Sequence, residues 1–329
     1  MSWNKIVQEI RSKKGPDGRP DIDRFRRDEY TKLEALTKRP LVVYATDFLN
    51  RAKVQACRGE VEIDLSDRQG MIEVTQDLPS GPVDFLISSP GGLPDAADSL
   101  VHILRRRFDH VRIIVMTIAK SAATMIALSA DEILMDENAE LGPIDPQFQF
   151  MKGDGTPVVA PAQAIIDQFD AAQKLLGSDP KRLTAWIPIL QQYGPALYQQ
   201  CHNAIELSKS YGRQWLEQWM FKGDPDAKAK ADKVVAYLGS HNEFKSHGAR
   251  IGVEELLAQG VRVKVLQKDH PELVEQLKRV SLALIHTFES TSAFRLWENS
   301  RGAALLRVVQ QQVIEVPVPM PGGPGPPRP

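Results

Sequence analysis

The chain has 329 residues, of which 42% are hydrophobic and 25% charged, so it can bury a large core and is neither fibrous nor wholly disordered. Its 41 lysines and arginines balance 42 aspartates and glutamates, which argues against a nucleic-acid partner. We find no signal-peptide core and no apolar stretch of bilayer length, and only two cysteines, so we expect a cytoplasmic protein with no integral membrane segment.

The first forty residues predict a helical extension outside the regular core. Residues 15–20 have the composition of a loop, and residues 21–37 form a charged segment of helical character. We expect this segment to pack on the outside of the core or against another subunit. Residues 1–40 are therefore assigned to an N-terminal helical extension.

Residues 41–150 predict an α/β core, because short apolar runs alternate with amphipathic segments. The expected strands are Leu41–Tyr44, Val83–Ile87, Arg112–Ile118 and Glu132–Met135, and the expected helices lie within 64–79, over 94–108 and from Ser121 to Leu128. Strands joined by crossover helices pair in parallel. We therefore expect a parallel sheet covered by helices.

Beyond residue 150 the pattern becomes helical. The expected helices are 161–176, 180–193, 195–221, two within 224–260 and more over 271–312, with one short strand at 261–266. We expect residues 151–315 to form a helical region that completes the core and supplies oligomer contacts. The tail, residues 316–329, is rich in proline and glycine and predicts a disordered or polyproline II extension.

Two strand-to-helix turns carry the residues best suited to chemistry. Gly91 and Gly92 follow one strand, and Ser121 opens the helix after the next, where free N–H groups and the helix dipole favour negative charge. If the turns are neighbours, the N–H groups of Gly92 and Ala122 can hold the oxygen of a carbonyl that Ser121 attacks, as acyl transfer requires. The alternative is that Ser121 only caps its helix and the glycines only form a tight turn.

Three core motifs stand out, at Ser88–Gly92, Ser121–Ala123 and Leu141–Gln147. In that order and spacing they resemble the serine dehydrogenase proteinase family of the Clp protease/crotonase superfamily, which is related to signal peptide peptidase A. The resemblance covers about residues 41–147. It implies a Clp protease/crotonase-like ββα superhelix, a homo-oligomer, a nucleophile at Ser121 and oxyanion donors at Gly92 and Ala122.

The general base is less well defined. A serine hydroxyl needs a base that takes its proton and a further group that orients this base. The region of the Clp histidine contains Asp145 instead, and the matching position of the peptidase A lysine falls near Gln163. The resemblance to the serine dehydrogenase proteinase branch implies a triad of Ser121, Asp145 and His247. Lys174, about three turns along the same helix as Gln163, is the alternative base.

We therefore predict a serine peptidase that cleaves polypeptide through an acyl-enzyme and uses no metal or other cofactor. His241, Glu243 and His247 make only a weak metal pattern, because no helix sets their spacing. Two alternatives stay open. One is a catalytically weak or inactive scaffold or binding oligomer of the same fold, and the other is a crotonase-type acyl-CoA enzyme, which uses the oxyanion hole without a nucleophile.

Overall fold

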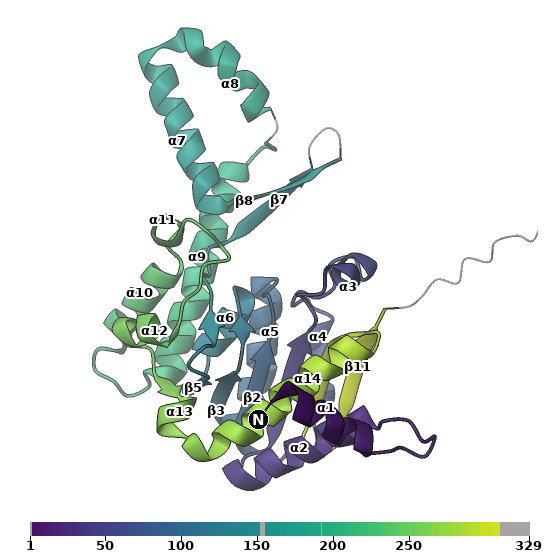
Figure 1. Cartoon of the computed structure of the whole chain (residues 1–329). Helices are drawn as coiled ribbons and strands as arrows, with labels where there is room; N and C mark the ends of the chain where they lie inside the picture. Colours follow the sequence, from purple (N-terminus) through teal and green to yellow (C-terminus); the bar gives the residue numbers. More distant parts are fainter. Residues whose placement is uncertain (1, 152–154, 192, 310–329) are drawn as a thin grey trace, which may run out of the picture.

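A computed structural model describes residues 2–151, 155–191 and 193–309, and a seven-stranded mixed sheet forms the centre of this part of the chain (Figure 1). The strands are β1 (Leu41–Thr46), β2 (Gly81–Ser88), β3 (Phe108–Val115), β5 (Glu132–Met135), β9 (Val263–Val265), β10 (Ala293–Asn299) and β11 (Ala304–Val308). Their order is β11-β10-β1-β2-β3-β5-β9. The five strands from β1 to β9 are parallel, and β10 and β11 add an antiparallel ribbon to one edge. The predicted α/β class is confirmed.

Helices cover both faces of the sheet, which explains why β1 and β10 are buried along their whole length. One face carries α4 (Asp67–Thr75), α5 (Pro94–Arg107), α6 (Ala122–Leu128), α10 (Ala227–Leu238) and α12 (Val253–Gln259). The other face carries α2 (Ile22–Thr37) and α14 (Val274–Ser290), and α1 (Trp3–Ser12) packs against α14. Ser121 immediately precedes α6 and so lies towards the face that α6 covers.

One segment differs from the sequence-based expectation. Residues 271–312 were expected to be helical throughout, but after α14 the chain forms the hairpin of β10 and β11. Arg295 and Glu298 are charged, yet both are buried in β10. Arg295 pairs with Asp67 at 3.0 Å and Glu298 pairs with Arg26 at 2.6 Å. The prediction failed because partners distant in sequence neutralise these buried charges.

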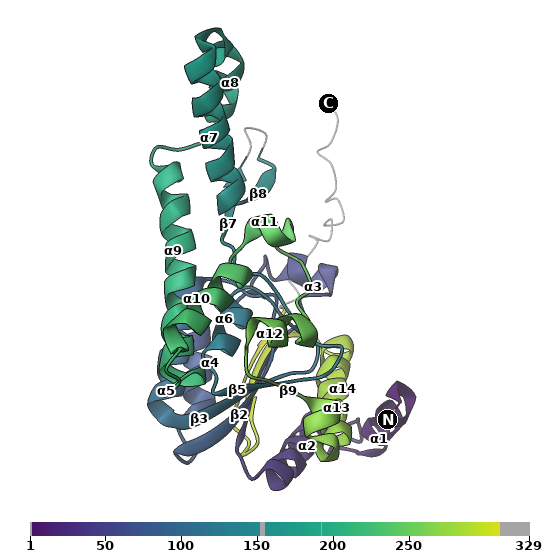
Figure 2. The same cartoon turned by 90° about the vertical axis from the view of Figure 1, so that its left-hand side faces the viewer.

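A second part of the molecule projects from the sheet (Figures 1 and 2). It contains the hairpin of β7 (Gln147–Met151) and β8 (Pro157–Pro161), then α7 (Ala162–Ser178) and α8 (Leu183–Leu190), and we call these four elements the arm. The arm returns to the body through α9 (Leu197–Trp215) and encloses a small apolar core of its own around Ile165, Ile166 and Cys201. The remaining elements are β4 (Ile118–Ala119), β6 (Glu140–Leu141), α3 (Arg51–Ala56), α11 (His241–Phe244), α13 (Leu266–Asp269) and short helical turns at 180–182, 216–220 and 271–273.

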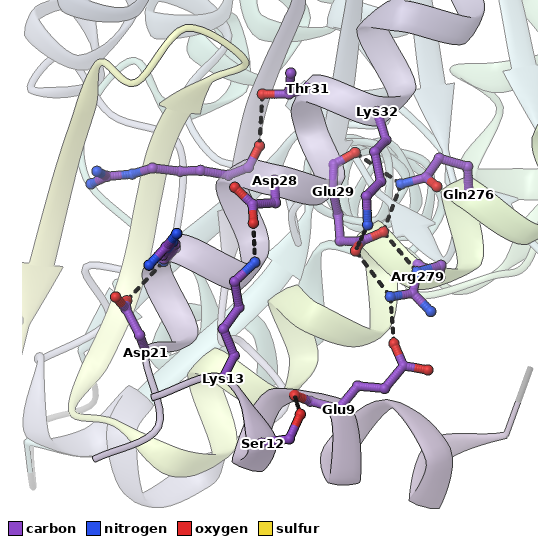
Figure 3. Close-up of polar contacts among 12 residues, drawn as sticks. Glu9, Ser12, Lys13, Asp21, Asp28, Glu29, Thr31, Lys32, Gln276 and Arg279 are labelled. Carbon is purple, nitrogen blue, oxygen red and sulfur yellow. Dashed lines mark hydrogen bonds and ion pairs between the residues drawn. The ribbon is translucent and has the colours of Figure 1, made fainter. Parts of the chain in front are cut away.

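The N-terminal helices are held on α14 by a buried charge network (Figure 3). Glu29 of α2 is 1% exposed and accepts hydrogen bonds from Arg279, Gln276 and Lys32. Arg279 also pairs with Glu9 of α1 at 2.6 Å. Burial alone would raise the pKa of Glu29, but the bonds from Arg279, Lys32 and Gln276 outweigh it and lower the pKa to about 2.

The domain limits proposed from the sequence stay predictions, and the tail at 316–329 lies outside the described residues. None of the helices described combines the length and the apolar character that crossing a membrane requires. Cys57 and Cys201 are both buried and free.

Candidate active site

The turn after β2 and the segment that leads into α6 lie side by side. The Ser89 N–H donates to the Ile118 carbonyl at 3.1 Å, and the Lys120 N–H donates to the Ser89 carbonyl at 3.0 Å. Gly91 then approaches the start of α6 so closely that a Cβ atom on it would lie 2.5 Å from the Ser121 Cβ. No side chain fits there, so the glycine at position 91 allows the two turns to meet.

Ser121 immediately precedes α6 in a strained backbone conformation, with φ at 49° and ψ at −118°. A non-glycine residue at positive φ costs of order 1–3 kcal/mol, and such residues cluster at functional sites, including the nucleophile turns of hydrolases. The Ser121 hydroxyl makes no capping bond to α6, and it has no hydrogen-bond partner within the part of the chain that the structure covers. The helix-cap interpretation is therefore unsupported, and the hydroxyl is free to meet a ligand.

The two predicted oxyanion donors are the N–H groups of Gly92 and Ala122. Ile63 fixes the chain around Gly92, because its N–H donates to the Gly91 carbonyl at 2.7 Å and its carbonyl accepts from the Leu93 N–H at 2.9 Å. Within residues 2–151, 155–191 and 193–309, the N–H groups of Gly92 and Ala122 have no acceptor. Both groups are thus available to an external oxygen, and their catalytic role stays a prediction.

A cavity of about 550 Å³ adjoins these turns. Its wall includes Gly92 and Ser121 from the two turns, together with Asp145 and His247 from later in the chain. The apolar part of the wall includes Met125, Ile144, Phe148, Val159 and Leu207. The structure therefore brings four of the residues singled out from the sequence to one cavity, although His247 follows Ser121 by more than a hundred positions.

Asp145 is the most heavily hydrogen-bonded group of the cavity. Its carboxylate is buried and accepts from Nδ1 of His247 at 2.7 Å, from Nδ1 of His241 at 3.2 Å and from Nε2 of Gln147 at 2.9 Å. In a neutral imidazole whose Nδ1–H binds a carboxylate, Nε2 is the nitrogen that can accept a proton. The pair of Asp145 and His247 therefore has the arrangement of an oriented base.

His247 and Ser121 are not in direct hydrogen-bonding contact in this structure. No hydrogen bond joins the His247 imidazole to the Ser121 hydroxyl among the described residues, although both line the same cavity. Catalytic hydrogen bonds are often long in ligand-free enzymes and tighten when substrate binds. The three groups therefore lie around one cavity with the proton-transfer contact unmade.

Neither Lys174 nor Lys120 is placed to act as a base for Ser121. Lys174 lies on α7 in the arm and is not among the residues that line the cavity, so the structure does not bring it to Ser121. Lys120, directly before the nucleophile, donates to the carbonyls of Leu141 and Ala249 at 3.0 and 2.9 Å and pairs with Glu140 at 2.9 Å. It ties three segments together behind the turn and is occupied by those bonds.

Three further groups were not identified from the sequence as parts of this site. Besides His241 and Gln147 on Asp145, the exposed Glu62 lies in the cavity wall. Desolvation there raises the pKa of Glu62 above its ordinary value, while the nearby His247 opposes the rise. Glu62 lies in a loop and His241 in a single turn of helix, so no local pattern marks them. Gln147 ends the third motif and begins β7, but the motif does not indicate its bond to Asp145. Among the described residues no group of three or more metal-type ligands is arranged to hold an ion.

A family model matches the central part of the chain. The model of a family described as ClpP-like SDH-type serine proteinase matches residues 62–169, a segment that contains Gly92, Ser121 and Asp145. The resemblance predicted from the motifs is therefore confirmed for this segment. His247 lies outside it.

Curated relatives match over short stretches. An uncharacterized protein of Methanocaldococcus jannaschii, MJ0137, is 42% identical over 87 residues, which are 26% of this chain and 30% of the relative. A second uncharacterized protein of that organism, MJ1495, is 42% identical over 67 residues, 20% of this chain and 23% of the relative. The matches thus span less than a third of either relative.

Among solved structures, the 1510-N membrane-bound stomatin-specific protease, determined as a mutant in complex with a substrate peptide, is 17% identical. The match covers 65% of this chain and 75% of that chain with a TM-score of 0.36. This likeness is too weak to carry an argument about the present site.

Proposed function

We propose that this chain, whose residues 62–169 match the model of the ClpP-like SDH-type serine proteinase family, is a serine peptidase that cleaves polypeptide through an acyl-enzyme. Ser121 attacks the scissile carbonyl, and the N–H groups of Gly92 and Ala122 bind the oxygen that becomes negative. His247 takes the hydroxyl proton through Nε2 and returns it to the leaving amine, while Asp145 fixes the imidazole.

The observation that carries this proposal is the position of Ser121. A serine in a strained turn, without a capping bond, borders a cavity whose wall also contains a histidine bonded to a buried aspartate. A serine that only capped the start of a helix would not need a positive φ. The free, buried cysteines Cys57 and Cys201 support the cytoplasmic location proposed with this function.

A fluorophosphonate probe tests the nucleophile. We expect the probe to label the wild-type chain and the variant Ser88→Ala at equal rates, and to leave Ser121→Ala unlabelled with unchanged circular dichroism. Ser88 is the matched control because it ends β2 beside the same turn but does not line this cavity. Labelling of Ser121→Ala would show that the reactive hydroxyl lies elsewhere.

The two histidines on Asp145 provide a second test, of the base. Only His247 lines the cavity, so His247→Gln should lower kcat for peptide cleavage by about 10²–10⁴-fold. His241→Gln removes the longer of the two bonds to Asp145 and should keep kcat within about tenfold of the wild type. Equal losses in both variants would contradict the assignment of His247 as base.

The alternative is a catalytically weak or inactive scaffold of the same fold. It is favoured by one observation, the missing hydrogen bond between Ser121 and His247 among the described residues. A wild-type chain that resists the fluorophosphonate probe in its assembled state would favour this alternative over the peptidase.

A further inference from the structure

A second cavity, of about 420 Å³, lies at the carboxyl ends of β1, β2 and β3. Its apolar wall includes Leu86, Met116, Leu284 and Phe288, which belong to the core between the sheet and α14. It shares no lining residue with the cavity at Ser121, whose core residues Met125 and Ile144 lie on the α6 face. This cavity is therefore a separate site.

The cavity wall contains exposed apolar side chains and one buried hydroxyl that forms no hydrogen bond in the described part of the chain. Leu49 and Ile285, which line it, are 75% and 38% exposed. The Thr46 side chain, also in the wall, is only 4% exposed, yet its hydroxyl has no hydrogen-bond partner among the described residues. A buried hydroxyl without a partner is rare in native proteins. The cavity thus suits an apolar occupant that brings at least one hydrogen-bonding group.

The chain itself leaves the described region next to this cavity. Val308, the last residue of β11, is paired with Ala293 of β10, and Thr46 of β1 is paired with Arg295 of β10. β11 therefore ends on the same side of the sheet as β1, where the cavity lies. Val309 packs on the same small apolar cluster as Phe48, which lines the cavity. Val309, the last described residue, therefore lies beside the mouth of the cavity.

The distance fits the sequence that follows. β11 is separated from β1 only by β10, so it lies roughly 10 Å from β1. The three glutamines 310–312 can span about 10 Å when extended. Residues 313–320 come next and read Val-Ile-Glu-Val-Pro-Val-Pro-Met, an apolar stretch with two prolines. Proline presets an extended backbone and so reduces the entropy lost on binding.

We propose that residues 313–320 of the same chain dock in the cavity between α14 and the ends of β1–β3, because this sequence supplies both the apolar groups that suit a wall containing Leu284 and Phe288 and the hydrogen-bond acceptors that the Thr46 hydroxyl lacks. A tether of three residues gives an effective concentration of order millimolar. An affinity too weak to matter between separate molecules is therefore enough within one chain. This inference does not depend on the proposed peptidase activity.

A labelled peptide of residues 310–320 tests the proposal. We expect it to bind saturably, by fluorescence anisotropy, to a chain that ends after Val309, and at least tenfold more weakly to the full chain, whose own segment occupies the cavity. In the shortened chain Ile285→Glu should weaken binding at least tenfold. Leu257→Glu, at an exposed leucine of α12 away from this cavity, is the matched control and should leave binding unchanged.

Equal binding to both chains, or no saturable binding to the shortened one, would overturn the proposal. A second readout uses the full chain with Ile285→Cys and Val318→Cys, since the native cysteines are buried. A short bismaleimide should join the two new thiols within one chain. A covalent dimer instead would show that the occupant comes from a second copy, and absence of both products would show that the segment does not reach the cavity.

Discussion

Gly91 is the residue on which the geometry of the nucleophile turn depends most directly. A Cβ atom there would lie 2.5 Å from the Ser121 Cβ and 2.7 Å from the Lys120 carbonyl oxygen, and its φ of 106° is unfavourable for any other residue. Backbone atoms cannot yield as a flexible side chain can. We therefore expect Gly91→Ala to lower kcat/KM for peptide cleavage about 10²-fold or more, because a displacement of 1 Å costs that much.

Gly81→Ala is the control for this variant. Gly81 also has a positive φ, 119°, but a Cβ on it would meet nothing within 4 Å. The change should cost roughly 1–2 kcal/mol of stability in thermal unfolding and leave kcat/KM near the wild-type value. If Gly91→Ala is as active as Gly81→Ala, contact between the two turns does not govern the site.

The residues of the site differ in how far the sequence reveals them. Gly92, Ser121 and Ala122 stand at strand-to-helix turns, so local pattern and glycine chemistry were enough to select them. His247 was selected only through a family resemblance, because no local rule links it to Asp145 across the 102 positions that separate them. His241 contacts the same carboxylate, but its sequence neighbourhood carries no signal of that contact.

At the scale of elements, the packing of α2 on α14 depends on the charge of Glu29. Its pKa is lowered to about 2 from an ordinary 4.5, so the folded protein binds the proton more weakly than the unfolded chain. The resulting stabilisation is fully present above pH 4.5 and is lost as the pH falls from 4.5 towards 2. Each tenfold change in proton affinity corresponds to about 1.4 kcal/mol, which gives roughly 3 kcal/mol at neutral pH.

Glu29→Gln tests this contribution. We expect the variant to lose about 2–3 kcal/mol of unfolding free energy at pH 7, measured by urea denaturation, and to depend less on pH below 4.5 than the wild type. Glu9→Gln removes the more exposed partner of the same arginine and should cost less than about 1 kcal/mol while keeping the acid dependence. If the unfolding free energy of Glu29→Gln still falls with pH as it does in the wild type, other carboxylates cause that fall.

Strands and helices could be predicted from the sequence where the buried residues are also the apolar ones. Residues 132–135 form β5 as predicted, since a short apolar run between polar residues has few other solutions. The hairpin of β10 and β11 was missed, because its strands contain Arg295 and Glu298, whose burial depends on partners in α4 and α2. Sequence periodicity carries no information about such distant partners.

At the scale of the whole molecule, the arm exposes several large apolar side chains in a single chain. No residue of α8 is buried although most of its residues are apolar. Leu183 and Ile187 of α8 are 47% and 38% exposed, and Met151 and Val159 of the β7–β8 hairpin are 66% and 60% exposed. Apolar surface gathered on one projection favours an interface. We therefore propose that the arm joins copies of this chain in the expected homo-oligomer.

The double variant Leu183→Glu/Ile187→Glu tests this role. Burying two such side chains contributes roughly 3 kcal/mol or more, so the dissociation constant of the oligomer should rise at least 10²-fold. Sedimentation velocity over a dilution series measures the change. Leu257→Glu, an equally exposed leucine on α12, should leave the assembly intact. An unchanged sedimentation coefficient in the double variant would place the interface elsewhere.

The proposed assembly through the arm bears on the proposed active site. The cavity at Ser121 is lined in part by two elements of the arm, β7 and β8, and by α9, which connects the arm to the body. The lining residues are Phe148 and Gln149 of β7, Val159 of β8 and Leu207 of α9. A contact that fixes the arm therefore fixes the cavity. We expect the peptidase activity per chain to fall on dilution in parallel with dissociation of the oligomer, and the double variant to label slowly with the fluorophosphonate at every concentration. A monomeric double variant that reacts with the fluorophosphonate at the wild-type rate would show that activity does not depend on assembly. Ser121, Asp145 and His247 would then need no contribution from a neighbouring copy.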